Sequence, residues 1–223
     1  MKVSIVVPTF NEERTIKDIL EKVKPYGDEI LVVSAKKSTD RTKEIAEEMG
    51  IRTVVDNGKG KGDGIRVGIE HASGDIIVFI DADGSHIPED IPKIVQPIKC
   101  GNADMVIASR FMGGSEELHG DFGKFMRMFL SISIAQLINW RFRTAIGDTQ
   151  NGFRAIKTDV AKDLKLEANI FDVETEMVMK CYKKGYKIVE VSSQEKKRLY
   201  GESGINIWRM GWVYAWRVFK NLW

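Results

Sequence analysis

The sequence predicts an α/β fold, in which a mostly parallel central sheet is flanked by helices. Strand-like apolar runs alternate along the chain with amphipathic segments of helical period. Residues 76–80 are apolar without interruption, which is typical of a strand that is buried on both faces. The length of 223 residues, with 43% hydrophobic and 30% charged residues, suits one globular domain.

The elements of this sheet can be assigned in order along the first half of the chain. We expect strands at residues 3–7, 30–33, 52–55, 76–80 and 104–108. We expect helices at residues 12–23 and 40–49, in a stretch that ends near residue 72, and between Pro88 and Pro97. Because strands and helices alternate, neighbouring strands are expected to run parallel.

Two later segments, residues 122–142 and 206–223, mix aromatic and basic residues. Four of the five tryptophans lie in the second segment. Amphipathic helices of this composition favour the membrane–water interface, and their lysine and arginine side chains suit anionic headgroups. Packing against the core or against a second copy of the chain is the alternative.

Composition excludes several classes of function. A net charge of +2 gives no broad attraction for nucleic acid. The two cysteines lack metal-ligand spacing and suit a reducing compartment, and the three histidines give no zinc pattern. The first residues are typical of a strand and not of a signal peptide, and no apolar stretch reaches the roughly 20 residues of a spanning helix. We therefore expect a cytoplasmic protein whose contact with a membrane is peripheral.

Two carboxylates follow the apolar run directly, in the sequence Asp81-Ala82-Asp83. The carboxyl end of a parallel strand is where open α/β sheets bind ligands. Like charges so close together usually need a cation, and hard oxygen ligands select Mg²⁺ or Mn²⁺. An ion in this position most often holds a diphosphate. A solvated turn that caps the next helix is the alternative.

Residues after the first strand and in a glycine-rich segment suit a nucleotide. Pro8-Thr9-Phe10 offers backbone groups and an aromatic face to a nucleobase and ribose. Glu12 is expected at the start of the first helix, where it complements the helix dipole and can accept a hydrogen bond; capping alone is the alternative. The segment 58–64, which includes Lys61, is expected to be a flexible basic loop that contacts phosphates, or else a plain surface loop.

Three arginines, Arg110, Arg127 and Arg198, are candidates for binding an anionic acceptor, because guanidinium groups match phosphate oxygens and stay charged. Surface salt bridges are the alternative for each of them. Asp148 is expected to position other groups, since a phosphate nucleophile is already ionised and needs no general base. The acids of residues 171–176 open a helix and are expected to interact with its dipole.

Five motifs, taken in order, carry a resemblance to a known family. They are Val7-Pro8-Thr9-Phe10-Asn11-Glu12, Asp81-Ala82-Asp83, Ala108-Ser109-Arg110-Phe111, the block from Asp148 to Arg154, and Arg198-Leu199-Tyr200-Gly201-Glu202-Ser203. Over residues 1–205 the chain resembles the inverting nucleotide-sugar glycosyltransferases of family two. Within that family it is similar to the polyprenyl-phosphate (dolichol-phosphate) mannose and glucose synthases.

The resemblance implies a single GT-A-type nucleotide-diphospho-sugar transferase domain at residues 1–205, followed by a C-terminal aromatic and basic helix at 206–223. It implies metal-dependent inverting transfer of a hexose from GDP-mannose or UDP-glucose to polyprenyl (dolichyl) phosphate. The protein would lie on the cytosolic face of a membrane, with residues 122–142 as an interface helix. Anchoring by a membrane partner subunit remains an open alternative.

The resemblance also assigns roles to residues. Pro8, Thr9, Phe10 and Glu12 would contact the nucleotide, and Lys61 and the Asp81-Ala82-Asp83 motif would lie at the donor. Asp83 and Ser85 would be the metal ligands, and Asp81 would orient hydroxyl groups of the sugar or ribose.

This chain departs from the family pattern at three places. The loop after the second strand, residues 32–40, lacks the usual paired aspartates, Ser85 replaces a glutamine, and Gly204 replaces a lysine. The altered loop and the missing lysine leave a non-catalytic nucleotide-binding relative as one alternative. A glycosyltransferase of the same fold with a soluble acceptor is the other.

Overall fold

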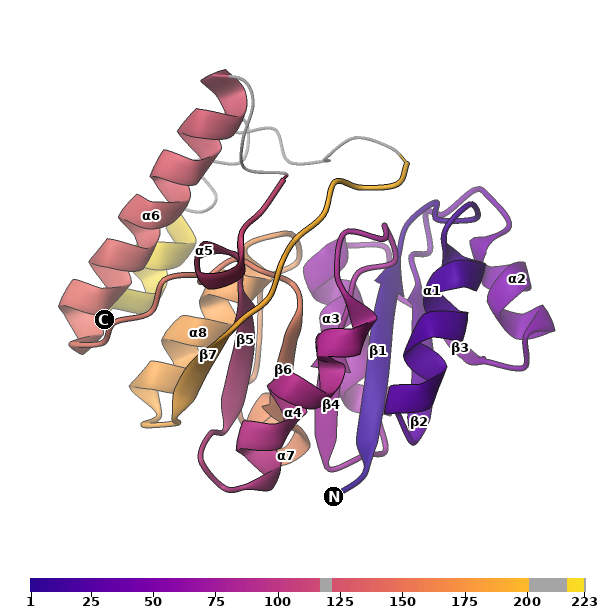
Figure 1. Ribbon diagram of the computed structural model, residues 1–223, viewed down its shortest axis with the longest axis horizontal. Coiled ribbons are helices and arrows are strands. Elements are labelled where there is room, and N and C mark those ends of the chain that lie inside the picture. The colour runs from indigo at the N-terminus through magenta and orange to yellow at the C-terminus, as the bar shows by residue number, and fades with distance from the viewer. Residues whose placement is uncertain (117–121, 201–215, 223) are drawn as a thin grey trace.

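The computed structural model describes residues 1–116, 122–200 and 216–222, except for the side chains of residues 122–125 and 127. Within these residues, seven strands form one sheet in the order β3-β2-β1-β4-β6-β5-β7 (Figure 1). The strands are β1 (Val3–Thr9), β2 (Glu29–Ser34), β3 (Arg52–Val55), β4 (Ile76–Phe79), β5 (Met105–Ser109), β6 (Arg154–Lys157) and β7 (Ile188–Ser192). β6 runs antiparallel to β4 and β5, and the other pairs are parallel. The predicted α/β fold with a mostly parallel sheet is confirmed.

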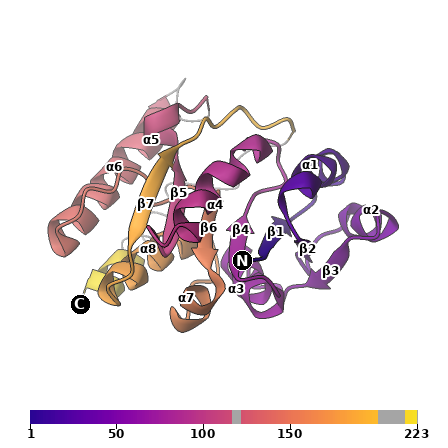
Figure 2. The ribbon, with the colours of Figure 1, turned by 60° about the horizontal axis from the view of Figure 1, so that its bottom comes forward.

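Helices cover both faces of the sheet (Figures 1 and 2). One face packs against α1 (Ile16–Val23), α2 (Thr42–Glu48) and α4 (Ile91–Lys99). The other packs against α3 (Lys61–His71), α6 (Phe122–Phe142), α7 (Thr158–Asp163) and α8 (Val173–Lys183). Short helices η1 (Lys24–Tyr26), η2 (Pro88–Asp90) and α5 (Arg110–Gly113) lie in the connections. Successive residues of β4 alternate between the two cores, as the pleat of a strand requires.

The five predicted strands are present, each within two residues of its expected boundaries. The helix predictions need three corrections. The first helix begins only at Ile16, because the carbonyl of Glu12 accepts hydrogen bonds from the N–H groups of Thr15 and Ile16 and forms a turn before the helix. Pro97 lies inside α4, where buried Ile98 keeps the last turn on the sheet. Residues 61–64 form the first turn of α3 instead of a flexible loop.

The two aromatic and basic segments are helical where they are described. Residues 122–142 form α6, and residues 216–222 form a short C-terminal helix. Residues 206–215 and Trp223, which belong to the predicted C-terminal helix, lie outside the described residues. None of the described helices combines the length and the apolar content that a bilayer-spanning segment needs.

The topology gathers four chain segments at one edge of the sheet. β1, β4, β5 and β7 all run in the same direction, with Val6 beside Phe79 and Ser109 beside Ser192. The segments that follow these strands therefore leave from the same edge. Such an edge, at the carboxyl ends of parallel strands, is where a ligand site is expected in an open α/β sheet.

Candidate active site

Asp81, just beyond β4, lies between two basic side chains. The Nζ atom of Lys61 is 2.9 Å from its carboxylate, and the Nε2 atom of His86 is 3.5 Å from Oδ2. Burial opposes ionisation of Asp81, yet the charge of Lys61 and the contact with His86 hold the pKa of this carboxyl well below its usual range. Asp81 is therefore an ionised group whose orientation is fixed from two sides.

Lys61 joins Asp81 to a second acid, Glu174, in the first turn of α8. Its Nζ atom lies 3.1 Å from Oε1 of Glu174. Burial alone would lower the pKa of Lys61, but the two carboxylates outweigh it and raise that pKa above the usual value. Lys61 thus stays charged, and its position is set by its place in the first turn of α3 and by these two partners.

Asp83 is buried, and each of its two carboxylate oxygens contacts a polar or charged neighbour. Oδ1 accepts hydrogen bonds from the N–H group (3.0 Å) and the hydroxyl (2.6 Å) of Ser85, and Oδ2 lies 3.2 Å from Nε of Arg198. The structure therefore brings Arg198 to Asp83 and Ser85, which precede it by more than a hundred residues in the sequence.

The residues around Asp83 can be tested for a divalent cation. Among the described residues, no group of three or more His, Cys, Asp or Glu side chains is arranged to hold a metal. Asp83 and Ser85 supply two oxygens, and the space beside Oδ2 already accommodates a cationic group. Mg²⁺ is usually held by one or two carboxylates, with substrate phosphates and water as the other ligands. The residues therefore fit an Mg²⁺ or Mn²⁺ ion whose coordination a diphosphate completes.

Glu12 lies within electrostatic reach of both aspartates. Burial raises its pKa to about 7, and the charges of Asp83 and Asp81 add to this effect, while a hydrogen bond from the hydroxyl of Thr15 (3.1 Å) opposes it. Glu12 is thus a carboxyl group at the mouth of the site whose charge changes near neutral pH.

The residues predicted for the nucleotide occupy the end of β1 and the loop after β4. Pro8 and Thr9 end β1, and Thr9 is buried with its hydroxyl 3.4 Å from the carbonyl of Val33. Phe10 is 57% exposed and offers an open aromatic face, whereas Ala82 is buried and can contribute only backbone groups. The carboxylate of Asp40 caps Thr42 and accepts the N–H of Glu13, so it holds the adjacent loop.

Arg110 is held by a buried carboxylate. Its Nε and Nη2 atoms donate to Asp148 at 2.7 and 2.9 Å, and its Nη1 atom lies 3.7 Å from Glu195. Asp148 is fully buried, and although burial opposes its ionisation, Arg110 holds its pKa below the usual value. The carboxylate of Asp148 thus orients Arg110 from a buried position, and its role in the reaction stays a prediction.

Two features of the site were missed by sequence reasoning. Glu174 was expected to interact only with the helix dipole, but it pairs with Lys61. Gly152 approaches the site so closely that a Cβ atom there would lie 2.8 Å from Oδ2 of Asp81. The glycine after Asn151 is a signal for close backbone approach, whereas nothing local marks Glu174. The side chain of Arg127, the third arginine predicted for the acceptor, lies outside the described part of α6.

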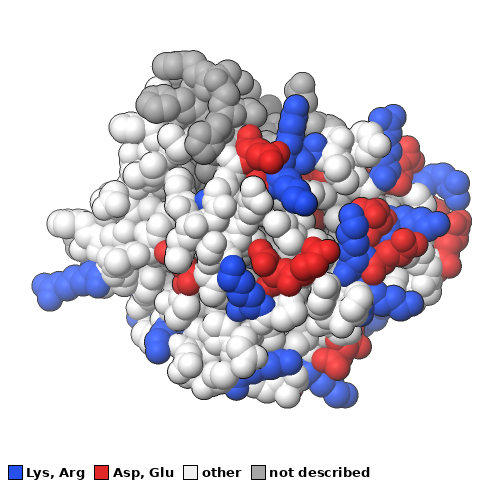
Figure 3. Space-filling view, in the orientation of Figure 1, with Lys and Arg blue, Asp and Glu red and all other residues white. Residues whose placement is uncertain are grey.

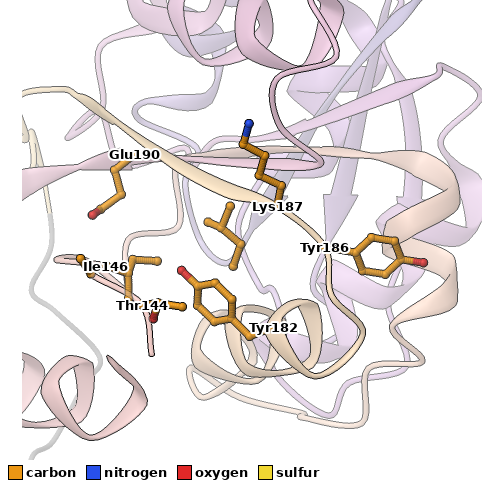
Figure 4. Close-up of a pocket in the computed structure, with 8 residues that line it drawn as sticks. Thr144, Ile146, Tyr182, Tyr186, Lys187 and Glu190 are labelled. Carbon is orange, nitrogen blue, oxygen red and sulfur yellow. The ribbon is translucent and has the colours of Figure 1, made fainter. Parts of the chain in front are cut away.

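A pocket of about 350 Å³ lies elsewhere, between the end of α8, β7 and the loop after α6 (Figure 4). Thr144, Tyr182 and Glu190 line it, and none of the predicted site residues does. Glu190 connects it to the site only indirectly, because its carboxylate accepts the N–H groups of Gly147 and Asp148 at 2.7 and 2.8 Å. This pocket is not part of the candidate active site.

Comparison with known proteins settles which family carries this geometry. The sequence model of glycosyl transferase family 2 matches residues 4–165, which include both strand-end aspartates and the Arg110–Asp148 pair. The chain belongs to glycosyl transferase family 2. It is a glycosyltransferase, and the family resemblance read from its motifs is confirmed.

Several relatives of this family 2 chain have been named. It is 34% identical over 197 residues to the uncharacterized protein MJ1222 of Methanocaldococcus jannaschii, covering 85% of this chain and 79% of the relative. It is 32% identical to a dolichol-phosphate mannosyltransferase of Pyrococcus furiosus, covering 91% and 59%, and 31% identical to glycosyltransferase AglJ of Haloferax volcanii, covering 85% and 61%. The chain thus spans about three fifths of the length of these last two proteins.

Solved structures of similar fold include glucosyl-3-phosphoglycerate synthase from Mycobacterium tuberculosis. Its complex with Mn²⁺, uridine diphosphate and phosphoglyceric acid has a TM-score of 0.76 at 21% identity, covering 99% of this chain and 78% of that one. A complex of the same enzyme with Mg²⁺ and uridine diphosphate has a TM-score of 0.74 at 21% identity, covering 99% and 78%. The likeness confirms a single domain of the GT-A type for this family 2 chain.

Proposed function

We propose that this protein transfers a hexose from a nucleoside diphosphate sugar, GDP-mannose or UDP-glucose, to the phosphate of a polyprenol at a membrane surface. The strand-end carboxylates, the fixed lysine between Asp81 and Glu174, and the arginines at the same edge of the sheet support this proposal. The name of the Pyrococcus furiosus relative, a dolichol-phosphate mannosyltransferase, supports the acceptor class.

Asp83 and Ser85 would hold the divalent cation. When bound, the cation would supply Lewis-acid stabilisation of the negative charge that develops on the departing diphosphate. Pro8, Thr9, Phe10 and Glu12 would line the nucleotide. These contacts would fix the donor before the acceptor attacks its anomeric carbon from the side opposite to the departing diphosphate.

Asp81, Lys61 and Glu174 would bind the hexose. The ion pairs that join them leave Oε2 of Glu174 buried with no hydrogen-bond partner among the described residues. A buried carboxylate oxygen without a donor is unfavourable, and a sugar hydroxyl would satisfy it. These three charged side chains also disfavour an apolar group at this position.

The arginines would receive the acceptor phosphate. Arg198 lies at Asp83, and Arg110 is oriented by Asp148. Arg127 belongs to this set by the family resemblance alone. A phosphate monoester is ionised at neutral pH, so it can attack without a general base. This fits the burial of Asp148 and its pairing with Arg110.

The exposed apolar residues on the outer face of α6 support the proposal that the acceptor is a lipid. Phe129, Ile132, Leu137 and Trp140 recur at helical spacing and are exposed, with Trp140 at 74%. Figure 3 shows few charged side chains over α6 in that view, whereas charged side chains gather over the β1–β3 half. An exposed apolar row flanked by arginines fits the interfacial region of a bilayer.

An acceptor screen tests the proposed function. The protein would be incubated with Mn²⁺, with GDP-mannose or UDP-glucose, and with either a short polyprenyl phosphate or 3-phosphoglycerate, and the products would be identified by mass spectrometry. We expect a polyprenyl phosphohexose from one of the two donors. Transfer to 3-phosphoglycerate alone would replace the lipid acceptor with a soluble one, and hydrolysis or binding without transfer to either would refute the proposal.

A further inference from the structure

The segment that follows β7 crosses the loop that carries Asp83. We call residues 193–200 the strap. The N–H of Lys196 donates to the carbonyl of Ser85 at 2.8 Å, and the N–H of Leu199 donates to the carbonyl of Asp83 at 3.2 Å. Gly84, in a left-handed conformation with φ +78°, faces the strap so closely that a Cβ atom would lie 2.6 Å from Leu199. The strap is therefore seated on the residues that would hold the cation.

The strap brings a positive charge to the buried carboxylate of Asp83. Nε of Arg198 is 3.2 Å from Oδ2, and the two side chains are 29% and 6% exposed. The neighbouring acid needs no such partner, because Lys61 and His86 already flank Asp81. Among the described ion pairs, the Arg198 guanidinium is thus the cationic group that offsets the charge of Asp83.

We propose that Arg198 and the divalent cation compete for Asp83, so that cation binding releases Arg198 to take the acceptor phosphate. Oδ1 of Asp83 is engaged by Ser85, which leaves Oδ2 as the oxygen for which both positive groups compete. Two cations at one buried carboxylate oxygen repel each other strongly, because little water screens them. The second half of this inference, the transfer of Arg198 to the acceptor, rests on the proposed function.

This exchange imposes an order on binding. Before the cation and the donor diphosphate enter, the guanidinium is occupied by Asp83 and is a weaker ligand for an incoming phosphate. With a cation at Asp83, the guanidinium of Arg198 would no longer be needed at Oδ2 and could turn its donors toward phosphate oxygens. Donor and acceptor binding are then coupled positively through one side chain, and an acceptor is not held at a site that lacks a donor.

The test of the competition measures Mn²⁺ affinity in the absence of any acceptor or donor, from the electron paramagnetic resonance signal of free Mn²⁺. Arg198→Ala should bind Mn²⁺ about fivefold more tightly than the wild type, or better. The matched control is Lys197→Ala, which removes the same charge from the adjacent exposed position of the strap and should change the affinity by less than about twofold. Equal or weaker Mn²⁺ binding by Arg198→Ala, or an equal gain in both variants, would overturn the competition.

A second measurement tests the release. Calorimetry would give the affinity of the wild type for a short polyprenyl phosphate, with and without Mn²⁺ and a nucleoside diphosphate. We expect tighter lipid binding when both are present, and no such gain in Arg198→Ala. Absence of the gain in the wild type would refute the release. Because the Mn²⁺ titration contains no acceptor, failure of the polyprenyl phosphate as a substrate would leave its result standing, and the two failures are distinguishable.

Discussion

Two acids that lie two positions apart in the sequence have different surroundings in this protein, and this difference divides their work. Asp81 is paired with Lys61 and His86, which suits a group that orients hydroxyls. Asp83 is hydrogen-bonded to Ser85 and faces the guanidinium of Arg198, which suits a group that exchanges one cation for another. The proposed roles therefore rest on contacts that sequence spacing alone does not define.

Gly152→Ala tests how closely the site is packed around Asp81. The added methyl would lie 2.8 Å from Oδ2 of Asp81 and 3.0 Å from Nζ of Lys61. Both are ends of side chains, so the ion pair should shift while the backbone stays in place. We expect kcat/KM for the donor to fall about tenfold or more. The free energy of unfolding, measured in urea, should change by less than about 1 kcal/mol; a large loss of stability with normal activity would contradict this.

Glu12→Gln tests the raised pKa of Glu12. The folded protein keeps the Glu12 proton up to about pH 7, whereas the unfolded chain releases it near the usual value of 4.5. The folded state therefore binds more protons within this window, so the stability of the wild type should fall as pH rises from about 4.5 to 7. The variant lacks this loss. The free energy of unfolding should be measured below pH 4.5 and above pH 7 for both proteins. The variant should gain stability relative to the wild type at the higher pH, and parallel pH profiles would contradict the raised pKa of Glu12.

At the scale of elements, the short C-terminal helix at 216–222 is tied to the start of α8. Nε of Arg217 lies 2.6 Å from Asp172, and Nη1 lies 3.4 Å from Glu176, and both acids are almost fully buried. Trp216 and Phe219 on the same helix are exposed. Since α8 also carries Glu174, the C-terminal helix and the candidate active site both rest on α8.

Arg217→Ala would remove the cationic partner of buried Asp172 and one of the two that Glu176 has, since Lys180 stays 3.0 Å from Glu176. We expect a loss of about 3 kcal/mol in the free energy of unfolding, as for other buried pairs that lose one partner. Lys220→Ala, on the same helix, removes an exposed pair with Glu167 and should cost less than about 0.5 kcal/mol. Urea denaturation of both variants provides the measurement. A similar, small effect in the two variants would show that the Arg217 pairs do not hold the helix.

If the outer face of α6 contacts a membrane, its exposed aromatic residues should be needed for binding to liposomes. Replacing Phe129 and Trp140 together by serine removes two exposed aromatic groups that have no packing role in the core. We expect flotation with anionic liposomes to fall several-fold while the thermal midpoint stays unchanged. Val55→Ser, an exposed apolar position on β3, is the control and should float like the wild type. Undiminished flotation of the double variant would exclude this face as the membrane contact.

At the scale of the whole molecule, most of the fold follows from the sequence, because helix and strand periods are local properties. The exceptions are instructive. β6 and β7 are short segments without a distinctive apolar run, and their places in the sheet depend on long-range pairing. Pro97 predicts a helix end by local rules, but packing of α4 against the sheet overrides it.

In the candidate site, too, local features could be predicted from the sequence and long-range contacts could not. The strand-end acids, Ser85 and the arginines could be named from motifs, since each follows a recognisable strand or turn. Their partners could not be named. The pairing of Lys61 with Glu174, of Arg110 with Asp148 and of Arg198 with Asp83 joins segments far apart in the chain, and only the folded sheet brings them together.

The most direct measurement is the initial rate of hexose transfer to polyprenyl phosphate by the wild type and by Asp83→Ala, as a function of Mn²⁺ concentration. Loss of the cation's stabilisation of the leaving diphosphate is worth several kcal/mol, so we predict that Asp83→Ala is slower by a factor of about 100 or more at every Mn²⁺ concentration. Wild-type rates with an unchanged Mn²⁺ dependence in Asp83→Ala would contradict the account.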